Sequence, residues 1–199
     1  MYGKNVKKPY EAFQDLRRRL QDPEFLAGHG LGNEVPFFIL PYAAQQEDEV
    51  RQLTHSLVAD FSQDNQGARV IHFDLWDVFL QLCEDRRILG KVSALEERRG
   101  TEGLLKRLQK IATPEAFLAT MKQRYDQLGG QQANRDAVLI SGVGRAYPIV
   151  RAHSILENAQ PIFTEVPMVM LYPGVYDGQQ LHLFGKISDG NYYRAFSLI

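Results

Sequence analysis

Cysteine is nearly absent from this sequence, because Cys83 is the single one among 199 residues. One thiol cannot form an internal disulfide, which excludes a disulfide-stabilised secreted scaffold. No apolar run follows the N-terminal lysines, so we expect no signal peptide. No uncharged apolar stretch approaches the roughly 20 residues that a membrane span needs. These absences predict a cytoplasmic protein with no membrane partner.

A strong excess of charge of either sign is also missing. The chain has 23 lysines and arginines against 24 aspartates and glutamates, which gives a formal net charge of -1. No global field would therefore draw the protein onto nucleic acid or an anionic membrane. No two of the five histidines have the spacing of a metal pair on one helix, and there is no cysteine pair. We expect no metal site.

Motifs for phosphate binding and for nucleophilic catalysis are missing as well. A phosphate-binding loop needs glycines and a Lys-Ser/Thr pair. Neither is present at residues 41–47, and no matching loop occurs anywhere else in the sequence. Ser141 does not lie in a Gly-x-Ser-x-Gly elbow, so hydrolase chemistry lacks its local signature. We therefore assign no catalytic residue and no cofactor.

What the sequence does contain is an alternation of strand-like apolar runs and amphipathic helical segments. The middle strands are almost continuously apolar, which is typical of a parallel sheet covered on both faces. This pattern predicts an α/β fold with a mostly parallel central sheet and helices on both faces. It would be P-loop- or Rossmann-like without a functional phosphate loop. The expected strands lie at 36–42, 68–75, 136–141 and 166–172, and the expected helices at 9–20, 47–61 and 148–157.

Two parts of the chain depart from this alternation. Short turns join the last two or three strands, which include 180–185 and 193–198, so they should be antiparallel. Residues 86–130 are helical and highly charged. Because no linker-like stretch bounds them, we interpret about 86–130 as a helical insertion within a single domain of residues 1–199.

Polar residues mark two helix starts. Asp74 ends an expected strand, where it could be catalytic or could cap the next helix, and capping is the commoner role. Thr113 precedes Pro114, which is the usual order of an N-cap and a first helical residue. Both positions therefore favour a structural interpretation.

A Gly-Val-Gly turn at 142–144 follows the expected strand 136–141. Ligands of open α/β sheets bind beyond the carboxyl ends of the strands. A dinucleotide fingerprint would require a third glycine at Tyr147 and an acid ending the next strand, whereas Glu165 precedes that strand. A sharp strand-to-helix turn is the favoured interpretation. The candidates for a nucleotide site are Gly142, Gly144 and Arg145.

Aromatic residues gather towards the C-terminus together with an arginine. These residue types are enriched at protein–protein hot spots. Packing in the core and at the edge of the sheet is the alternative interpretation. The candidates for partner binding are Tyr172, Tyr176, Tyr192, Tyr193, Arg194 and Phe196.

Four motifs in the second half of the chain point to a known family. They are Ser-Gly-Val-Gly-x-x-Tyr-Pro-x-x-Arg-x-His at 141–153, Tyr-Pro-Gly-x-Tyr-Asp-Gly at 172–178, Leu-Phe-Gly at 183–185 and Asp-Gly-Asn-Tyr-Tyr-Arg-Ala-Phe at 189–196. In this order, and in a chain of this length, they resemble the BrxB proteins of BREX bacteriophage-exclusion systems. The C-terminal motifs are the most specific part.

The resemblance implies an antiviral role within a multi-protein assembly. That assembly includes a DNA methyltransferase, an ATPase and a PglZ-type protein of the alkaline-phosphatase fold. The resemblance implies a non-catalytic adaptor or scaffold that binds the PglZ-type protein of the same operon. Two alternatives stay open. One is a degenerate, ATPase-like nucleotide-binding domain with a sensing or regulatory role, and the other is a DNA-binding accessory protein that uses Arg17–Arg19, Arg98 and Arg99.

Overall fold

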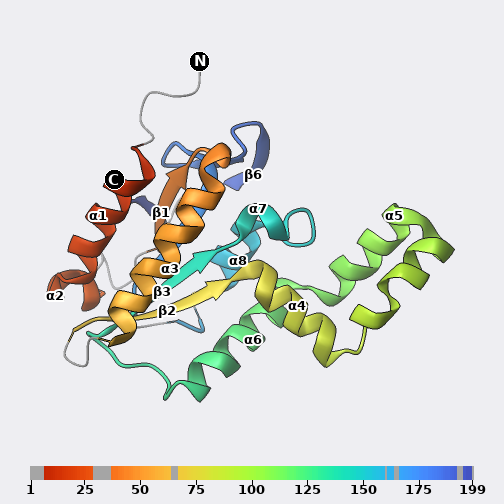
Figure 1. Cartoon of the computed structure of the whole chain (residues 1–199), viewed down its shortest axis with the longest axis horizontal. Helices are drawn as coiled ribbons and strands as arrows, with labels where there is room; N and C mark the ends of the chain where they lie inside the picture. Colours follow the sequence, from red (N-terminus) through yellow and green to blue (C-terminus); the bar gives the residue numbers. More distant parts are fainter. Residues whose placement is uncertain are drawn as a thin grey trace.

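A seven-stranded sheet forms the centre of the structure, a computed structural model that describes residues 7–28, 37–63, 67–159, 161–163, 166–191 and 195–198 (Figure 1). The strands are β1 (Phe37–Tyr42), β2 (Arg69–Asp74), β3 (Asp136–Ser141), β4 (Met168–Tyr176), β5 (Gln180–Leu183), β6 (Ile187–Asn191) and β7 (Ala195–Ser197). The main path of the sheet is β2-β3-β4-β1-β7, while β5 pairs with β4 and β6 pairs with β5.

Helices precede β1 and connect β1 to β2, β2 to β3 and β3 to β4. They are α1 (Pro9–Leu20), α2 (Pro23–Leu26), α3 (Glu47–Gln63), α4 (Leu75–Asp85), α5 (Val92–Ile111), α6 (Pro114–Gln127), α7 (Val143–Ala146) and α8 (Ala152–Ala159), with 3-10 turns η1 (Ala44–Gln46) and η2 (Leu89–Lys91). Within the described part of the chain, none of these helices combines the length and the apolar character that crossing a bilayer requires.

Two hydrophobic cores lie on opposite faces of the sheet. Successive side chains of a strand point to opposite faces, so neighbours such as Ile39 and Leu40 enter different cores. One core contains residues of α1, α2 and α3, and the other contains residues of α4, α5, α6, α7 and α8. This arrangement confirms the predicted α/β fold with a mostly parallel sheet and helices on both faces.

The strand β4 forms both parallel and antiparallel pairs with its neighbours. Its first part, up to Pro173, is parallel to β1 and β3. Its last three residues, from Gly174, pair with β5 in the antiparallel sense, as β5 does with β6. The antiparallel prediction is therefore confirmed for these C-terminal strands. It is wrong for β7, because the chain crosses to the far side of β1 and pairs there in parallel.

Local signals set several boundaries. The Asp74 carboxylate accepts hydrogen bonds from the backbone of Trp76 at 2.9 Å and Asp77 at 3.4 Å, which confirms its capping role. The helix expected at 148–157 begins later, as α8 at Ala152, and the separate short helix α7 precedes Pro148. Pro148 separates the two, because proline lacks an N–H and holds the preceding Tyr147 in an extended conformation.

Residues 86–130 contain η2, α5 and α6. Gly100 breaks α5 with φ 69° and ψ 169°, so its two halves fold back on each other and project from the sheet (Figure 1). The buried residues of α5 all lie in its second half; they are Leu104, Leu108 and Ile111. We call Val92–Ile111 the α5 arm. Its charged first half is exposed on the outside of the molecule.

Candidate functional site

A polar cluster lies at the carboxyl ends of β2 and β3. The Asp74 Oδ2 atom accepts hydrogen bonds from the Ser141 hydroxyl at 2.9 Å and from the Arg145 guanidinium. His72 Nε2 lies 2.8 Å from the Ser141 Oγ. We call His72, Asp74, Ser141 and Arg145 the carboxyl-edge cluster. Its members satisfy one another, while the other Asp74 oxygen caps α4.

The carboxyl-edge cluster leaves little room for a ligand. The space among it, the end of β1 and the start of α3 is about 10 Å³, barely enough for one water molecule. Burial lowers the pKa of His72 and favours its neutral form near pH 7. Tyr42 donates a 2.5 Å hydrogen bond to Glu47 there, and its burial raises the pKa of the phenol. These groups form a closed hydrogen-bonded corner.

The candidates Gly142, Gly144 and Arg145 border this corner. Gly142 has φ 73°, and a Cβ there would lie 2.3 Å from Asp74 Oδ1. A Cβ on Gly144 would lie 3.1 Å from the ring of Phe184. The guanidinium of Arg145 is paired with Asp74. These contacts favour the strand-to-helix turn over a nucleotide site at these three residues.

A second polar group joins three of the sequence motifs, which lie far apart in the chain. Asp189 of β6 is 1% exposed, and the Tyr172 hydroxyl donates to it at 3.4 Å. Asp189 Oδ1 lies 3.6 Å from Arg151 Nε and 3.7 Å from His153 Nδ1, at the start of α8. We call these four residues the Asp189 cluster. Burial raises the pKa of the Asp189 carboxyl, although the neighbouring His153 and Arg151 offset part of the rise.

Ser154 extends the Asp189 cluster, because its Oγ lies 3.2 Å from His153 Nε2. A hydrolytic triad would need the carboxylate to hold the imidazole by a hydrogen bond. The 3.7 Å separation between Asp189 and His153 is longer than such a bond. Within the described residues, His153 Nδ1 and Asp189 Oδ1 have no hydrogen-bond partner. The cluster is therefore an anchor between β6 and α8, with incompletely satisfied polar atoms.

The aromatic candidates separate into three groups. Tyr172 and Tyr176 are buried, and the Tyr176 hydroxyl donates to the Ala195 carbonyl at 2.7 Å. Their burial corrects their assignment to a contact surface, since they belong to the core, as the packing alternative predicts. Phe196 is exposed and contacts the ring of Phe38. The other candidates, Tyr192, Tyr193 and Arg194, lie outside the described residues.

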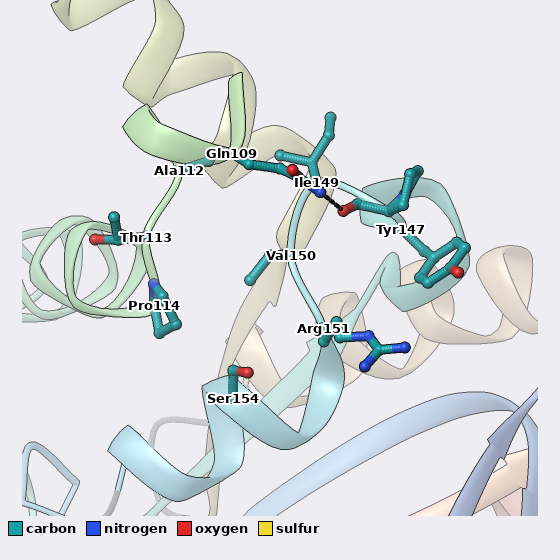
Figure 2. Close-up of a pocket in the computed structure, with 10 residues that line it drawn as sticks. Gln109, Ala112, Thr113, Pro114, Tyr147, Ile149, Val150, Arg151 and Ser154 are labelled. Carbon is teal, nitrogen blue, oxygen red and sulfur yellow. Dashed lines mark hydrogen bonds between the residues drawn. The ribbon is translucent and has the colours of Figure 1, made fainter. Parts of the chain in front are cut away.

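A crevice of about 420 Å³ lies where the α5 arm meets the body of the protein. Figure 2 shows that the end of α5, the start of α6, residues 147–151 and α8 surround it. The Gln109 amide donates to the Pro148 carbonyl at 2.8 Å and so ties the arm to the segment between α7 and α8. Sequence reasoning missed this contact, because the two residues are 39 positions apart.

The arginines of the DNA-binding alternative do not form one basic face. Arg17 pairs with Asp60 and Arg18 pairs with Asp15, both on the α1 side of the molecule. Arg98 and Arg99 lie on the α5 arm, at the opposite end in Figure 1. Among the described residues, no group of histidine, cysteine, aspartate and glutamate is placed to hold a metal ion.

Comparisons with known proteins agree with the motifs. The family described as BREX protein BrxB matches residues 71–198. A BREX protein BrxB of Bacillus cereus (strain H3081.97) is 34% identical over 191 residues, which cover 95% of this chain and 96% of that protein. A BREX protein BrxB of Escherichia coli O9:H4 (strain HS) is 29% identical over 184 residues, or 92% of this chain and 88% of that protein. No solved structure matches the chain. The match of this family to more than half of the chain, including both polar clusters, shows that the chain belongs to the BrxB family.

Proposed function

We propose that this protein is a non-catalytic adaptor in BREX bacteriophage defence and that it binds the PglZ-type protein of the same operon. Membership of the BrxB family supports the role in defence. The observation that carries the adaptor role is the closed carboxyl-edge cluster. Beyond the carboxyl ends of β2 and β3, where the sequence suggests a nucleotide site, these polar groups bond one another around a space of about 10 Å³, so this corner offers no room for a substrate.

The α5 arm is the proposed contact surface. It projects from the sheet, and its first half exposes charges of both signs, among them Glu96, Glu97, Arg98 and Arg99. Charged side chains at the rim of an interface steer association and select the partner. The C-terminal surface around Phe196 is the other candidate, but the burial of Tyr172 and Tyr176 leaves it with fewer aromatic contacts.

Co-purification with the tagged PglZ-type protein tests both the partner and the surface. We expect the wild-type protein to form a stoichiometric complex. The double variant Arg98→Glu/Arg99→Glu should lower the recovered complex about tenfold or more, because each reversed charge changes association by roughly 1 kcal/mol. The matched control is Arg18→Glu/Arg19→Glu, which changes two adjacent exposed arginines of α1.

The two double variants separate the outcomes. Loss of the complex in the α1 variant alone would place the interface on the opposite side of the molecule. Equal recovery of both variants with wild-type yield would remove the α5 arm from the proposal. A folded wild-type protein that does not co-purify at moderate salt would contradict the adaptor function itself.

The degenerate nucleotide-binding alternative remains as a second candidate function. It draws no support from the Gly142 turn, where Asp74 and Phe184 fill the space beside the glycines. The feature that favours it is a separate and open cleft beyond the ends of β1 and β4. The DNA-binding alternative lacks a comparable feature, because its arginines are divided between α1 and the α5 arm.

A further inference from the structure

A cleft of about 850 Å³ opens beyond the carboxyl ends of β1 and β4. Residues 42–46 form one wall, and Gly174 and Val175 of β4 form part of another. The turn between β5 and β6 and the residues before α1 complete it; they contribute Phe184, Gly185, Lys186, Lys7 and Lys8. The volume falls in the range of roughly 300–1,000 Å³ that is typical of small-molecule sites.

The cleft lies between two neighbouring strands, β1 and β4, whose following connections run to opposite sides of the sheet. β1 lies between β4 and β7, and its chain leaves through α3 to β2 at the far edge. The chain that follows β4 continues instead to β7 on the other side of β1. In open α/β sheets, ligands bind outside the carboxyl ends of the strands at such a switch point. Topology therefore marks this cleft, rather than the Gly142 turn, as the ligand position.

The charged side chains that line the cleft are lysines. Lys7 pairs with Asp15 at 2.5 Å. Lys8 and Lys186 are exposed, and neither forms an ion pair with any residue that the structure describes. The first turn of α3 carries three acids, Glu47 to Glu49, so this helix start disfavours an anion. The two unpaired lysines are therefore the groups that would receive a negatively charged ligand.

An aromatic ring stands beside these lysines. Phe184 is 40% exposed and has φ 56°, a left-handed conformation that bulky residues seldom adopt. Its backbone N–H donates to the Pro173 carbonyl at 2.8 Å, which fixes the turn. Tyr147 contacts the ring edge-to-face at 6.5 Å, and Gly144 makes room for it. The protein thus holds an exposed ring firmly in the wall of the cleft, where a planar group can stack on it.

We propose that this cleft binds a mononucleotide, with its base stacked on Phe184 and its phosphates bound by Lys8 and Lys186. A phosphorylated ligand with a planar ring is the chemical class that satisfies both features at once. The cleft is limited to about 850 Å³ and the net charge of the chain is -1. Both observations favour a small ligand over a nucleic-acid strand, which needs an extended basic groove. The proposal is independent of partner binding.

Equilibrium titration and thermal unfolding with ATP and GTP test this site, with adenosine and tripolyphosphate as the separate halves of the ligand. A ligand that binds only the folded state raises the melting temperature. We expect one of the nucleotides to bind and stabilise the protein. Phe184→Leu should weaken binding about tenfold, since the aromatic face on which the base stacks is removed. Lys8→Gln/Lys186→Gln should also weaken it about tenfold, since both charges that would contact the phosphates are removed.

The control is Lys106→Gln/Lys110→Gln, which removes two exposed lysines of the α5 arm and should leave binding unchanged. All the lysines changed are exposed, so these variants should fold, and circular dichroism verifies this. The proposal is overturned if neither nucleotide binds, or if both cleft variants bind as the wild type does. It is also overturned if tripolyphosphate alone binds as tightly as the nucleotide, or if oligothymidylate binds more tightly. None of these results depends on recovery of the PglZ-type protein.

Discussion

Two buried carboxylates, one at each end of the sheet, differ in how completely their oxygen atoms are hydrogen-bonded. Asp136, at the amino end of β3, is 0% exposed and fully bonded. Arg69 donates to its two oxygens at 2.7 and 2.6 Å. The Tyr125 hydroxyl donates at 2.5 Å, and the backbone of Gln132 donates at 2.9 Å. This carboxylate holds β2, β3 and α6 together at the amino edge.

Asp189 is buried to almost the same degree but has poorer partners. Its contacts with Arg151 and His153 are 3.6 and 3.7 Å long, and its Oδ1 atom has no hydrogen-bond partner in the described structure. A buried polar atom without a partner costs roughly 1–3 kcal/mol. The comparison teaches that the amino edge is built for stability, whereas the opposite side of the molecule retains unsatisfied polarity. Three substitutions test this contrast.

The largest effect is expected for Asp136→Ala. Removing the carboxylate leaves the Arg69 guanidinium and the Tyr125 hydroxyl without their shared partner, and breaking a buried ion pair costs about 3–5 kcal/mol. Urea unfolding should show this fall in the free energy of unfolding. The control is Asp126→Ala, whose ion pair with Lys122 is exposed and should contribute less than about 1 kcal/mol. Equal losses in both variants would refute the special role of Asp136.

An intermediate effect is expected for Gly142→Ala, which acts on the third carboxylate, Asp74. The new Cβ would meet Asp74 Oδ1 at 2.3 Å, in a backbone with φ 73°. We expect a loss of about 1–3 kcal/mol. Gly178→Ala separates the two causes, since Gly178 has φ 94° but no atom within 4 Å of an added Cβ. If thermal unfolding gives the same loss for both, the contact with Asp74 contributes nothing.

The smallest effect at neutral pH is expected for Asp189→Asn, at less than about 1 kcal/mol. Burial raises the pKa of Asp189 in the folded protein. The wild type therefore loses stability as the pH rises from the unfolded value near 3.9 through the higher folded value. Asparagine does not ionise, so the variant should gain stability relative to the wild type over that range. Urea unfolding between about pH 3.5 and 7 measures the difference, and parallel curves would contradict the raised pKa.

Much of the sheet could be predicted because its central strands are apolar and have clear ends. The expected strand at 136–141 coincides with β3, and the expected helix at 9–20 coincides with α1. β6 was missed, since Ile-Ser-Asp-Gly-Asn lacks the alternating pattern of a strand. Its conformation comes from pairing with β5, and strand propensity depends strongly on such neighbours.

The candidate sites were harder to predict, for two physical reasons. An aromatic-rich segment has the same composition in a core and at an interface, so the sequence alone could not separate Tyr172 from Phe196. The proposed nucleotide cleft combines residues 7–8, 42–46 and 174–186, which meet only when the chain is folded. Phe184 lies in the Leu-Phe-Gly motif, but the motif alone does not show that a left-handed turn exposes the ring of Phe184 beside Lys186.

The dual pairing of β4 also limits how this chain can change in length. Alternate residues of a strand face the same side, so Tyr172, Gly174 and Tyr176 share one side of β4. Inserting one residue at Pro173 would reverse every side chain beyond it and expose Tyr176. Gly174 adds a second restriction, because a Cβ there would lie 2.1 Å from the His182 carbonyl oxygen. Insertions in related chains should therefore be found at the turn 177–179. Additional residues there do not change which side of the sheet each side chain of β4 faces.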